Sequence, residues 1–190
     1  NKIELNSQLS EMARKEIAPY REGLQIIPEN SVSAAVLVHH FPYNNKACFA
    51  LIERPVYNGV HSGQIALPGG KMESSDKDLI DTAKREAFEE VNIEPNDVKV
   101  IGSLSDLYIP PSNFHVKPVL SYSHELPSFQ KEEKEVAEIL IVSTEELLNC
   151  KVKQTKIQLQ NDLLFKTPYL DLSQKVVWGA TAMILNELKI

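Results

Sequence analysis

Three glutamates close together form the most chemically suggestive group in the sequence: Glu86, Glu89 and Glu90. In a helix, at roughly 100° per residue, their side chains fall within one arc about 100° wide. Carboxylates crowded on one face repel one another, so a cation would stabilise them, and oxygen ligands suit hard divalent ions. Arg85 reaches Glu89 at the i, i+4 spacing but neutralises only one of the carboxylates. The group therefore indicates either a divalent-metal site or a solvated acidic face of a helix.

A tight loop and a helix must position these glutamates. Pro68-Gly69-Gly70 can turn the backbone sharply because glycine accepts positive φ. The acidic stretch that follows predicts a helix of about four turns. Ser75 or Asp76 is expected to cap its start, and Asn92 is expected in a left-handed conformation at its end. The apolar face of this helix is predicted to consist of Ile80, Ala83, Ala87 and Val91.

Residues 67–93 resemble the signature of the Nudix hydrolases, a glycine followed at a set distance by Arg-Glu-x-x-Glu-Glu, a small residue and an aliphatic one. The matching residues are Gly70, Arg85, Glu86, Glu89, Glu90, Asn92 and Ile93. The interval from the glycine to the arginine is one residue longer than in the common pattern. Asp76 and Asp78 therefore both remain candidates for the acidic residue within it. Asn92 replaces the usual glycine, and Asn is the next most tolerant residue in a left-handed conformation.

The resemblance implies the Nudix α/β/α sandwich, whereas periodicity alone supports only an α/β or α+β chain. It also implies Mg²⁺ or Mn²⁺ held by four ligands, which are the Gly70 carbonyl, Glu86, Glu89 and Glu90. Arg85 would orient these glutamates. A water activated by the metal would attack phosphorus in a diphosphate, and Glu89 or Glu135 would take the proton. Glu135 is a candidate because a Glu-Val pair precedes the corresponding strand in one group of the family.

The segment before the glycine turn resembles the Nudix enzymes that hydrolyse coenzyme A. The residues that match this subgroup are Leu51, Arg54, Gly63, Pro68, Gly69 and Gly70. Gly59 stands where the subgroup has an arginine that could bind a phosphate. The C-terminal Trp-Gly-x-Thr-Ala, which begins at Trp178, resembles the end of the same subgroup, and Trp178 is expected in the core. The candidates for substrate binding are Arg54, Lys71 and Gly69.

The function that this resemblance implies is metal-dependent hydrolysis of a nucleoside diphosphate derivative. Coenzyme A or acyl-coenzyme A would give 3′,5′-ADP and (acyl-)4′-phosphopantetheine. Because Gly59 replaces the arginine of the coenzyme A subgroup, a Nudix hydrolase that acts on ADP-ribose or NADH remains an alternative. A non-catalytic Nudix-like nucleotide-binding regulator is another alternative, although the complete set of Arg85, Glu86, Glu89 and Glu90 argues against it. A further alternative is a plain acidic scaffold protein, for which the glycine turn before the helix would be a coincidence.

Length and charge limit the class of protein. The chain has 190 residues, 43% of them hydrophobic, so we expect a single domain over residues 1–190 with an N-terminal helical extension over about 1–28. A net charge of −6 argues against duplex nucleic acid and leaves a small-molecule nucleotide as the expected partner. No apolar run reaches membrane-spanning length and no secretory pattern opens the chain. Cys48 and Cys150 are expected as reduced thiols, and a cytoplasmic location is the default.

Periodicity and turn residues predict the remaining elements. A helix over residues 3–17 is expected to pack on the domain or to contact a second copy in a homodimer. Helices are also expected over 144–148, capped by Ser143, and over 176–190. The Pro-rich loop over 108–113 is expected either to wall the substrate pocket or to be a plain crossover. Strands are expected over 31–39 and 47–53, paired as a hairpin, and over 98–107, 115–122, 136–142, 153–160 and 164–170.

Overall fold

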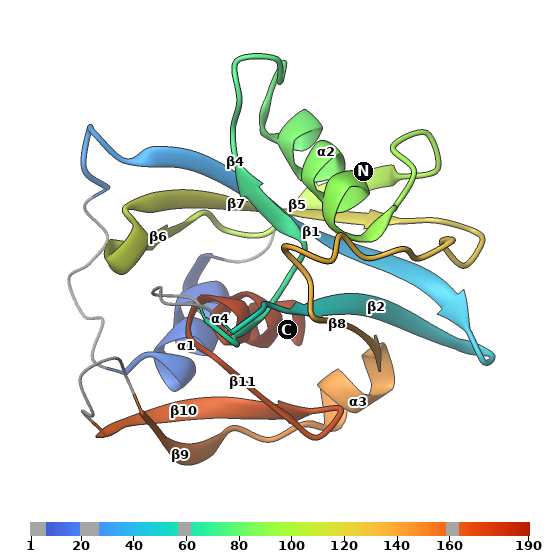
Figure 1. Cartoon of the computed structure of the whole chain (residues 1–190). Coiled ribbons are helices and arrows are strands. Elements are labelled where there is room, and N and C mark those ends of the chain that lie inside the picture. Colours follow the sequence, from blue (N-terminus) through green and yellow to red (C-terminus); the bar gives the residue numbers. More distant parts are fainter. Residues whose placement is uncertain (1–6, 20–26, 57–61, 159–163) are drawn as a thin grey trace.

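The structure is a computed structural model that describes residues 7–19, 27–56, 62–158 and 164–190 (Figure 1). In chain order, the elements of the described residues are α1 (Ser7–Ile17), β1 (Val32–Tyr43), β2 (Lys46–Glu53), β3 (Ile65–Ala66), β4 (Gly69–Lys71), α2 (Leu79–Val91), β5 (Lys99–Ser103), β6 (Leu107–Ile109), the short 3-10 helix η1 (Pro110–Ser112), β7 (Phe114–Tyr122), β8 (Glu138–Ser143), α3 (Thr144–Asn149), β9 (Lys153–Gln158), β10 (Leu164–Leu172), β11 (Lys175–Trp178) and α4 (Gly179–Leu188).

Strand β1 organises the larger sheet, which is mixed. It pairs antiparallel with β2 through a hairpin whose turn residues, Asn44 and Asn45, have φ of 49° and 58°. It also pairs parallel with β7 and antiparallel with β4, while β8 joins β2 and both β5 and β6 join β7. The predicted hairpin is confirmed. Strand β1 runs on to Tyr43, beyond the expected end at residue 39.

A second, antiparallel sheet follows in the order β11-β10-β9. The strands expected over 153–160 and 164–170 therefore form a sheet of their own. Residues 176–178, expected at the start of the last helix, lie in β11 instead. Val177 pairs with Leu170 of β10 in a tight hairpin and is fully buried, so strand pairing outweighs the helical spacing of these residues.

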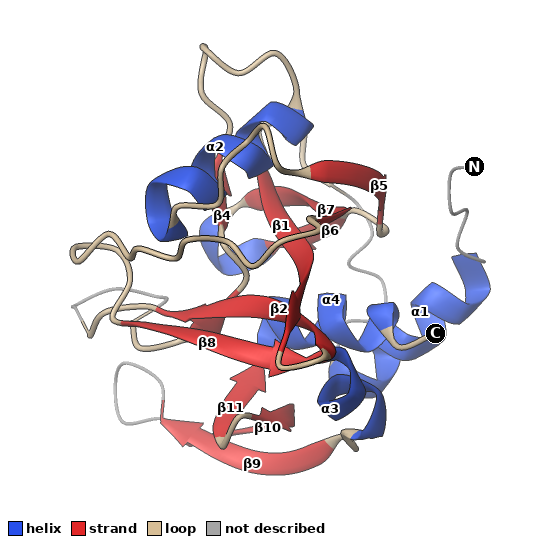
Figure 2. Cartoon of the chain, turned by 90° about the vertical axis from the view of Figure 1, so that its right-hand side faces the viewer, coloured by secondary structure: helices blue, strands red, loops and turns tan. Residues whose placement is uncertain are grey.

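Helices cover both faces of the larger sheet (Figures 1 and 2). On one face, Ala35 and Leu37 of β1 form a core with Ala83 and Ala87 of α2. On the other face, Val38 of β1 belongs to a second core that includes residues of α4, β10 and β11. Because successive strand residues point to opposite faces, β1 contributes to both cores. The predicted α/β class, with a mixed sheet between helical layers, is confirmed.

Helix α1 is held against α4 by a buried ion pair. Arg14 Nε lies 2.7 Å from Glu187 Oε2, and the Glu187 side chain is 0% exposed. Glu187 Oε1 also accepts hydrogen bonds from the backbone N–H and the hydroxyl of Ser105, at 2.9 and 2.7 Å. Arg14 donates in addition to the carbonyl oxygens of Ser105 and Asp106. The N-terminal helix therefore packs on the domain, and contact with a second copy in a homodimer stays a prediction. Residues 3–6 of the expected helix lie outside the described ranges.

The described residues contain no helix that is both long and apolar enough to cross a membrane. Cys48 is buried, Cys150 is partly buried, and both are free thiols, as the sequence predicts. The single domain over residues 1–190 and the cytoplasmic location remain predictions.

Candidate active site

The glycine turn lies directly against β1. Gly69 has φ of 152°, and a Cβ there would collide with the carbonyl oxygen of Ala35. Glycine therefore fits at this position where a larger residue would displace β1. The Gly69 N–H donates to Glu90 Oε2 at 2.8 Å. This bond ties the turn to the last turn of α2.

Helix α2 has a side-chain cap at its start and a left-handed residue at its end. Asp78 caps the start, where its Oδ1 accepts from the backbone N–H groups two and three residues on, at 2.8 and 2.9 Å. The cap expected at Ser75 or Asp76 is wrong, because Arg85 holds the Asp76 carboxylate. Asn92 has φ of 60° and ψ of 41°, which confirms the predicted left-handed end.

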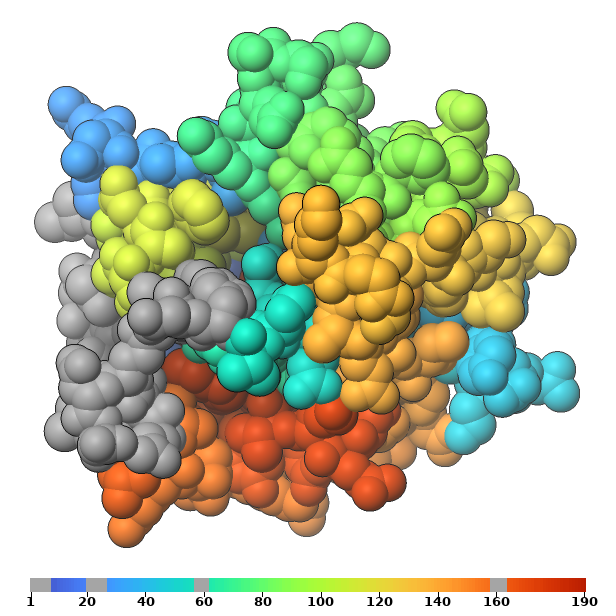
Figure 3. Space-filling view, viewed as in Figure 1, coloured from blue at the N-terminus to red at the C-terminus, as the bar shows by residue number. Residues whose placement is uncertain are grey.

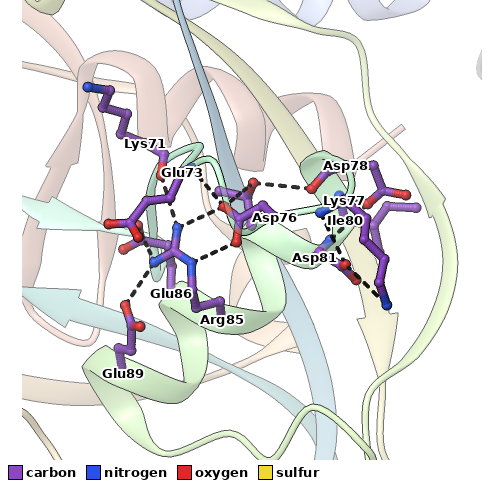
Figure 4. A network of polar contacts seen from close by, with 11 residues as sticks. Lys71, Glu73, Asp76, Lys77, Asp78, Ile80, Asp81, Arg85, Glu86 and Glu89 are labelled. Atoms are coloured by element: carbon purple, nitrogen blue, oxygen red, sulfur yellow. Dashed lines mark hydrogen bonds and ion pairs between the residues drawn. The ribbon is translucent and has the colours of Figure 1, made fainter.

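Arg85 connects α2 to the glycine turn (Figure 4). Its guanidinium contacts Asp76 twice, Nε to Oδ1 at 2.8 Å and Nη2 to Oδ2 at 3.0 Å. Nη1 donates to Glu86 Oε1 at 3.0 Å and to Glu89 Oε2 at 2.8 Å, and Nη2 donates to the Lys71 carbonyl at 3.0 Å. The hydrogen bonds from Arg85 hold the pKa of Asp76 well below its usual range. Arg85 is thus a fixed cation that holds two of the glutamates beside the turn.

These contacts give Asp76 and Asp78 different roles. Asp76 is only 4% exposed at its side chain, binds Arg85, and accepts a hydrogen bond from Thr82 Oγ1 at 2.9 Å. Asp78 caps the helix. Both aspartates lie before α2 begins, and only Asp76 folds back onto the guanidinium of Arg85.

The carboxylate of Glu86 lies over Gly70. A Cβ at Gly70 would come within 2.5–2.6 Å of the Glu86 carboxylate atoms, so the glycine leaves the space that this carboxylate occupies. Burial raises the pKa of Glu86, Arg85 opposes this shift, and the charges of Glu89 and Glu135 add to it. Glu86 is therefore a crowded and partly desolvated carboxylate beside the backbone of the turn.

Glu90 is almost fully buried, with 2% of its surface exposed. Burial raises its pKa to about 7, although the Gly69 N–H and the Arg54 guanidinium favour its ionised form. Arg54 Nη2 lies 3.9 Å from Glu90 Oε1. Strongly shifted acids of this kind occur both in functional sites and in structural networks. The Glu90 carboxylate therefore contacts both the Gly69 N–H and the Arg54 guanidinium.

Glu135 lies in the segment between β7 and β8 that docks on the end of α2. The backbone N–H of Glu132 donates to the Glu90 carbonyl at 2.9 Å. In Figure 3 this segment, in gold, lies beside α2 and the segment that follows β2. The charge of Glu135 contributes to the raised pKa of both Glu86 and Glu90, which places it in the neighbourhood of these glutamates. The side chain of Glu135 is exposed.

The glutamates are engaged by other groups of the protein in this conformation. Within the described ranges, no group of three or more His, Cys, Asp or Glu side chains is arranged to hold a metal ion. Glu86 and Glu89 contact Arg85, and Glu90 contacts Gly69. The residues still fit a divalent ion in two respects: their donors are all oxygen, and the local negative charge exceeds what Arg85 neutralises.

A cavity of about 550 Å³ opens beside the glycine turn. Gly69, Gly70 and Arg54 are among its lining residues, so the cavity and the carboxylate cluster share the turn. Pro111 and Ser112 also line it, so the Pro-rich loop walls this cavity, and its role in a substrate pocket stays a prediction. The volume lies within the roughly 300–1,000 Å³ of small-molecule sites.

The structure gathers most of the predicted site residues around the turn, namely Arg54, Gly69, Gly70, Arg85, Glu86, Glu89, Glu90 and Glu135. Lys71 is exposed, and in Figure 4 its side chain points away from Arg85. Gly59 lies outside the described residues. The sequence placed Trp178 in the core, whereas Trp178 is only partly buried and lines the cavity. The resemblance of the segment that begins at Trp178 to one Nudix subgroup was the available signal.

The NUDIX domain family matches residues 33–162 of the chain. The chain is 35% identical over 131 residues to a protein named uncharacterized Nudix hydrolase NudL from Pectobacterium atrosepticum, a match that covers 68% of this chain and 67% of that protein. It is 33% identical over 129 residues to a protein of the same name from Yersinia pestis, which covers 67% and 64%. The chain belongs to the Nudix hydrolase family, and it spans about two thirds of the length of these relatives.

Solved structures show the same fold. A MutT/nudix family protein from Enterococcus faecalis superposes with a TM-score of 0.52 at 14% identity, over 97% of this chain and 73% of that one. The Nudix hydrolase RenU from M. smegmatis superposes with a TM-score of 0.51 at 20% identity, over 61% and 73%. At these identities the likeness concerns the fold alone. It confirms the Nudix fold that the sequence predicts.

Proposed function

We propose that the chain hydrolyses the diphosphate of a nucleoside diphosphate derivative in a metal-dependent reaction, with coenzyme A or an acyl-coenzyme A as substrate. One observation carries this proposal: the Glu86 carboxylate occupies the space over Gly70, inside an acidic cluster whose charge Arg85 only partly neutralises. The cavity that shares the glycine turn provides room for a substrate. The coenzyme A assignment is supported by the match of Arg54, Gly63 and Pro68-Gly69-Gly70 to that subgroup.

In this proposal the metal ligands are the Gly70 carbonyl, Glu86, Glu89 and Glu90. A bound Mg²⁺ or Mn²⁺ would offset the charge of the diphosphate and lower the pKa of a water molecule. To reach such an ion, Glu89 leaves Arg85, and its partly exposed side chain can turn because 53% of its surface faces solvent. Arg85 remains fixed by Asp76 and keeps Glu86 over the turn.

The reaction breaks one bridging P–O bond. The oxygen of water forms a bond to phosphorus, the bridging oxygen leaves with the other phosphate, and the proton of the water goes to Glu89 or Glu135. Arg54, beside Glu90 and in the cavity wall, binds a phosphate oxygen. The Gly69–Glu90 bond holds the turn in place, and Lys71 is the further candidate for a phosphate contact from the exposed side.

Product analysis tests the proposal. The protein is incubated with coenzyme A, octanoyl-coenzyme A, ADP-ribose, NADH and diadenosine polyphosphates, with Mg²⁺, with Mn²⁺ and with chelator. Metal-dependent release of 3′,5′-ADP from the coenzyme A compounds, well above the other substrates, is the expected result. Cleavage of ADP-ribose or NADH instead would retain the Nudix chemistry and discard coenzyme A. Saturable nucleotide binding without any cleavage would favour the regulator.

A further inference from the structure

The cavity beside the glycine turn extends far beyond the segment that matches the Nudix family. Its wall includes Ile17 and Ala18 from the end of α1, Phe165 from β10, and Trp178 and Ala180 at the junction of β11 and α4. All of these residues lie outside residues 33–162. The flanking segments therefore complete a compartment that opens onto the turn where the reaction is proposed to occur.

This compartment is apolar and nearly free of charge. Arg54 is the only charged side chain among the described residues that line it. A nucleotide with several phosphates would lose hydration there with a single cation to compensate, which is unfavourable. A hydrocarbon chain gains free energy in the same surroundings, in proportion to the apolar surface that it buries.

The positions of charge and apolar surface assign the two halves of a substrate to different places. The diphosphate would lie at the turn, where Arg54 and the carboxylate cluster meet. The charged nucleotide half would then lie on the exposed side of the turn, near Lys71. The half on the other side of the diphosphate would enter the cavity.

We propose that the cavity binds the hydrocarbon chain of an acyl thioester, so that acylated substrates are cleaved in preference to the free thiol. This inference rests on the proposed function, because it takes the diphosphate at the glycine turn as its anchor. It names a specificity site built by α1, β10, β11 and α4 rather than by the segment that carries the catalytic glutamates.

Trp178 offers a direct measurement that needs neither metal nor turnover. It is the one tryptophan of the sequence and it lines the cavity. S-octanoyl-pantetheine, which has the acyl arm but no nucleotide, should change its fluorescence saturably, and pantetheine should do so at least tenfold more weakly. Equal responses to the two compounds, or no saturable response to either, would overturn the inference.

Kinetics with a cavity-filling variant provide the second measurement. Ala180 is partly buried and lines the cavity, so Ala180→Leu places a larger side chain inside it. The wild-type kcat/KM should be at least tenfold higher for octanoyl-coenzyme A than for coenzyme A, and Ala180→Leu should reduce this ratio at least fivefold. Val176→Leu is the matched control, because Val176 is 42% exposed and does not line the cavity. The same reduction in both variants, or a wild-type ratio near one, would contradict the inference.

The two proposals can fail separately. If no coenzyme A compound is cleaved while S-octanoyl-pantetheine still binds at Trp178 and Ala180→Leu weakens that binding, the proposed reaction is wrong and the acyl site stands. If coenzyme A and its octanoyl thioester are cleaved equally well, the reaction stands and the acyl site is wrong.

Discussion

Arg14 and Arg85 each hold carboxylates at a helix, but the balance of charge around them differs. Arg14 has one carboxylate partner, Glu187, which is fully buried and accepts further hydrogen bonds from Ser105. Arg85 is shared by Asp76, Glu86 and Glu89. The first group is neutral and closed, whereas the second keeps an excess of negative charge beside a cavity.

This difference separates a structural network from a candidate site. A buried ion pair in which every polar atom is satisfied fixes the position of two helices and needs no further ligand. A cluster in which one arginine serves three carboxylates is less stable than it would be with an added cation. The crowding around Arg85 therefore points to a ligand, and the network around Arg14 does not.

The largest effect is expected from Glu86→Gln. The variant keeps the shape of the side chain over Gly70 and removes a charge from the proposed metal site, so kcat/KM should fall by about a thousandfold, which corresponds to roughly 4 kcal/mol of transition-state stabilisation. The free energy of unfolding should stay the same or rise, because the lost charge was crowded and partly desolvated. Steady-state kinetics and urea unfolding measure the two quantities. Unchanged turnover would remove Glu86 from the site.

For Glu187→Gln we expect the opposite result, a loss of stability with nearly unchanged turnover. This variant leaves the partly buried guanidinium of Arg14 without its anion, which should lower the free energy of unfolding by about 3 kcal/mol. The kcat per folded molecule should remain within about twofold of wild type. Urea unfolding and kinetics at a temperature where the variant is folded check both points. Glu145→Gln, at an exposed ion pair with Lys46, is the control and should have no measurable effect on stability.

Metal binding to the native state should distinguish the two arginine networks directly. At a Mg²⁺ concentration about one hundred times the dissociation constant, the free energy of unfolding should rise by about 2.7 kcal/mol, provided that the unfolded chain does not bind the ion. The increase should persist in Glu187→Gln and be lost in Glu86→Gln. Calorimetry with Mg²⁺ and with chelator gives the measurement. An equal increase in both variants would place the ion elsewhere.

Local signals were sufficient for several parts of the fold. Asn92 was recognisable as the end of α2 because few residues adopt a left-handed conformation, and Ser143 caps α3 as expected. The β1–β2 hairpin could also be predicted, since its two strands are adjacent in the sequence. Asp76 and Asp78 could not be told apart, because both can cap a helix and only the reach of Arg85 decides between them.

Strand β11 was missed because its hairpin with β10 turns at Ser173 and Gln174, which have positive φ although neither residue type favours it. The other part that could not be predicted depends on contacts between distant segments. The cavity collects residues from both ends of the chain and from the glycine turn, so no stretch of sequence has its pattern. For the same reason Trp178 resembled a core residue when it was considered alone. The motif proposed to be catalytic is contiguous, whereas the surface proposed to select the substrate is not.

The smallest predicted effect concerns the buried His39 and its two serine partners. It tests whether the pH dependence of stability arises in this network, apart from the carboxylates around Arg85. His39 is buried in β1 between the hydroxyls of Ser121 and Ser123, at 2.9 and 3.1 Å from its ring nitrogens. Burial, with a smaller contribution from the charge of His40, lowers its pKa from 6.5 to about 4. The folded state therefore favours the neutral ring, and the unfolded state binds the proton more readily.

The stability that His39 contributes is consequently complete above pH 6.5 and is lost as the pH falls from 6.5 towards 4. Between pH 7.5 and 5.5 the loss should be about 1.3 kcal/mol. Burial raises the pKa of Glu90 to about 7, so its contribution to stability changes with the opposite sign in this range, but it is common to wild type and His39→Gln. Urea unfolding at the two pH values should therefore show the wild type losing about this much stability relative to His39→Gln. Burial also lowers the pKa of His40, so adding His40→Gln should remove a further loss of the same sign. An identical response to pH in wild type, His39→Gln and the double variant would assign that response to the carboxylate networks, and the comparison between Arg14 and Arg85 would then have to include protonation.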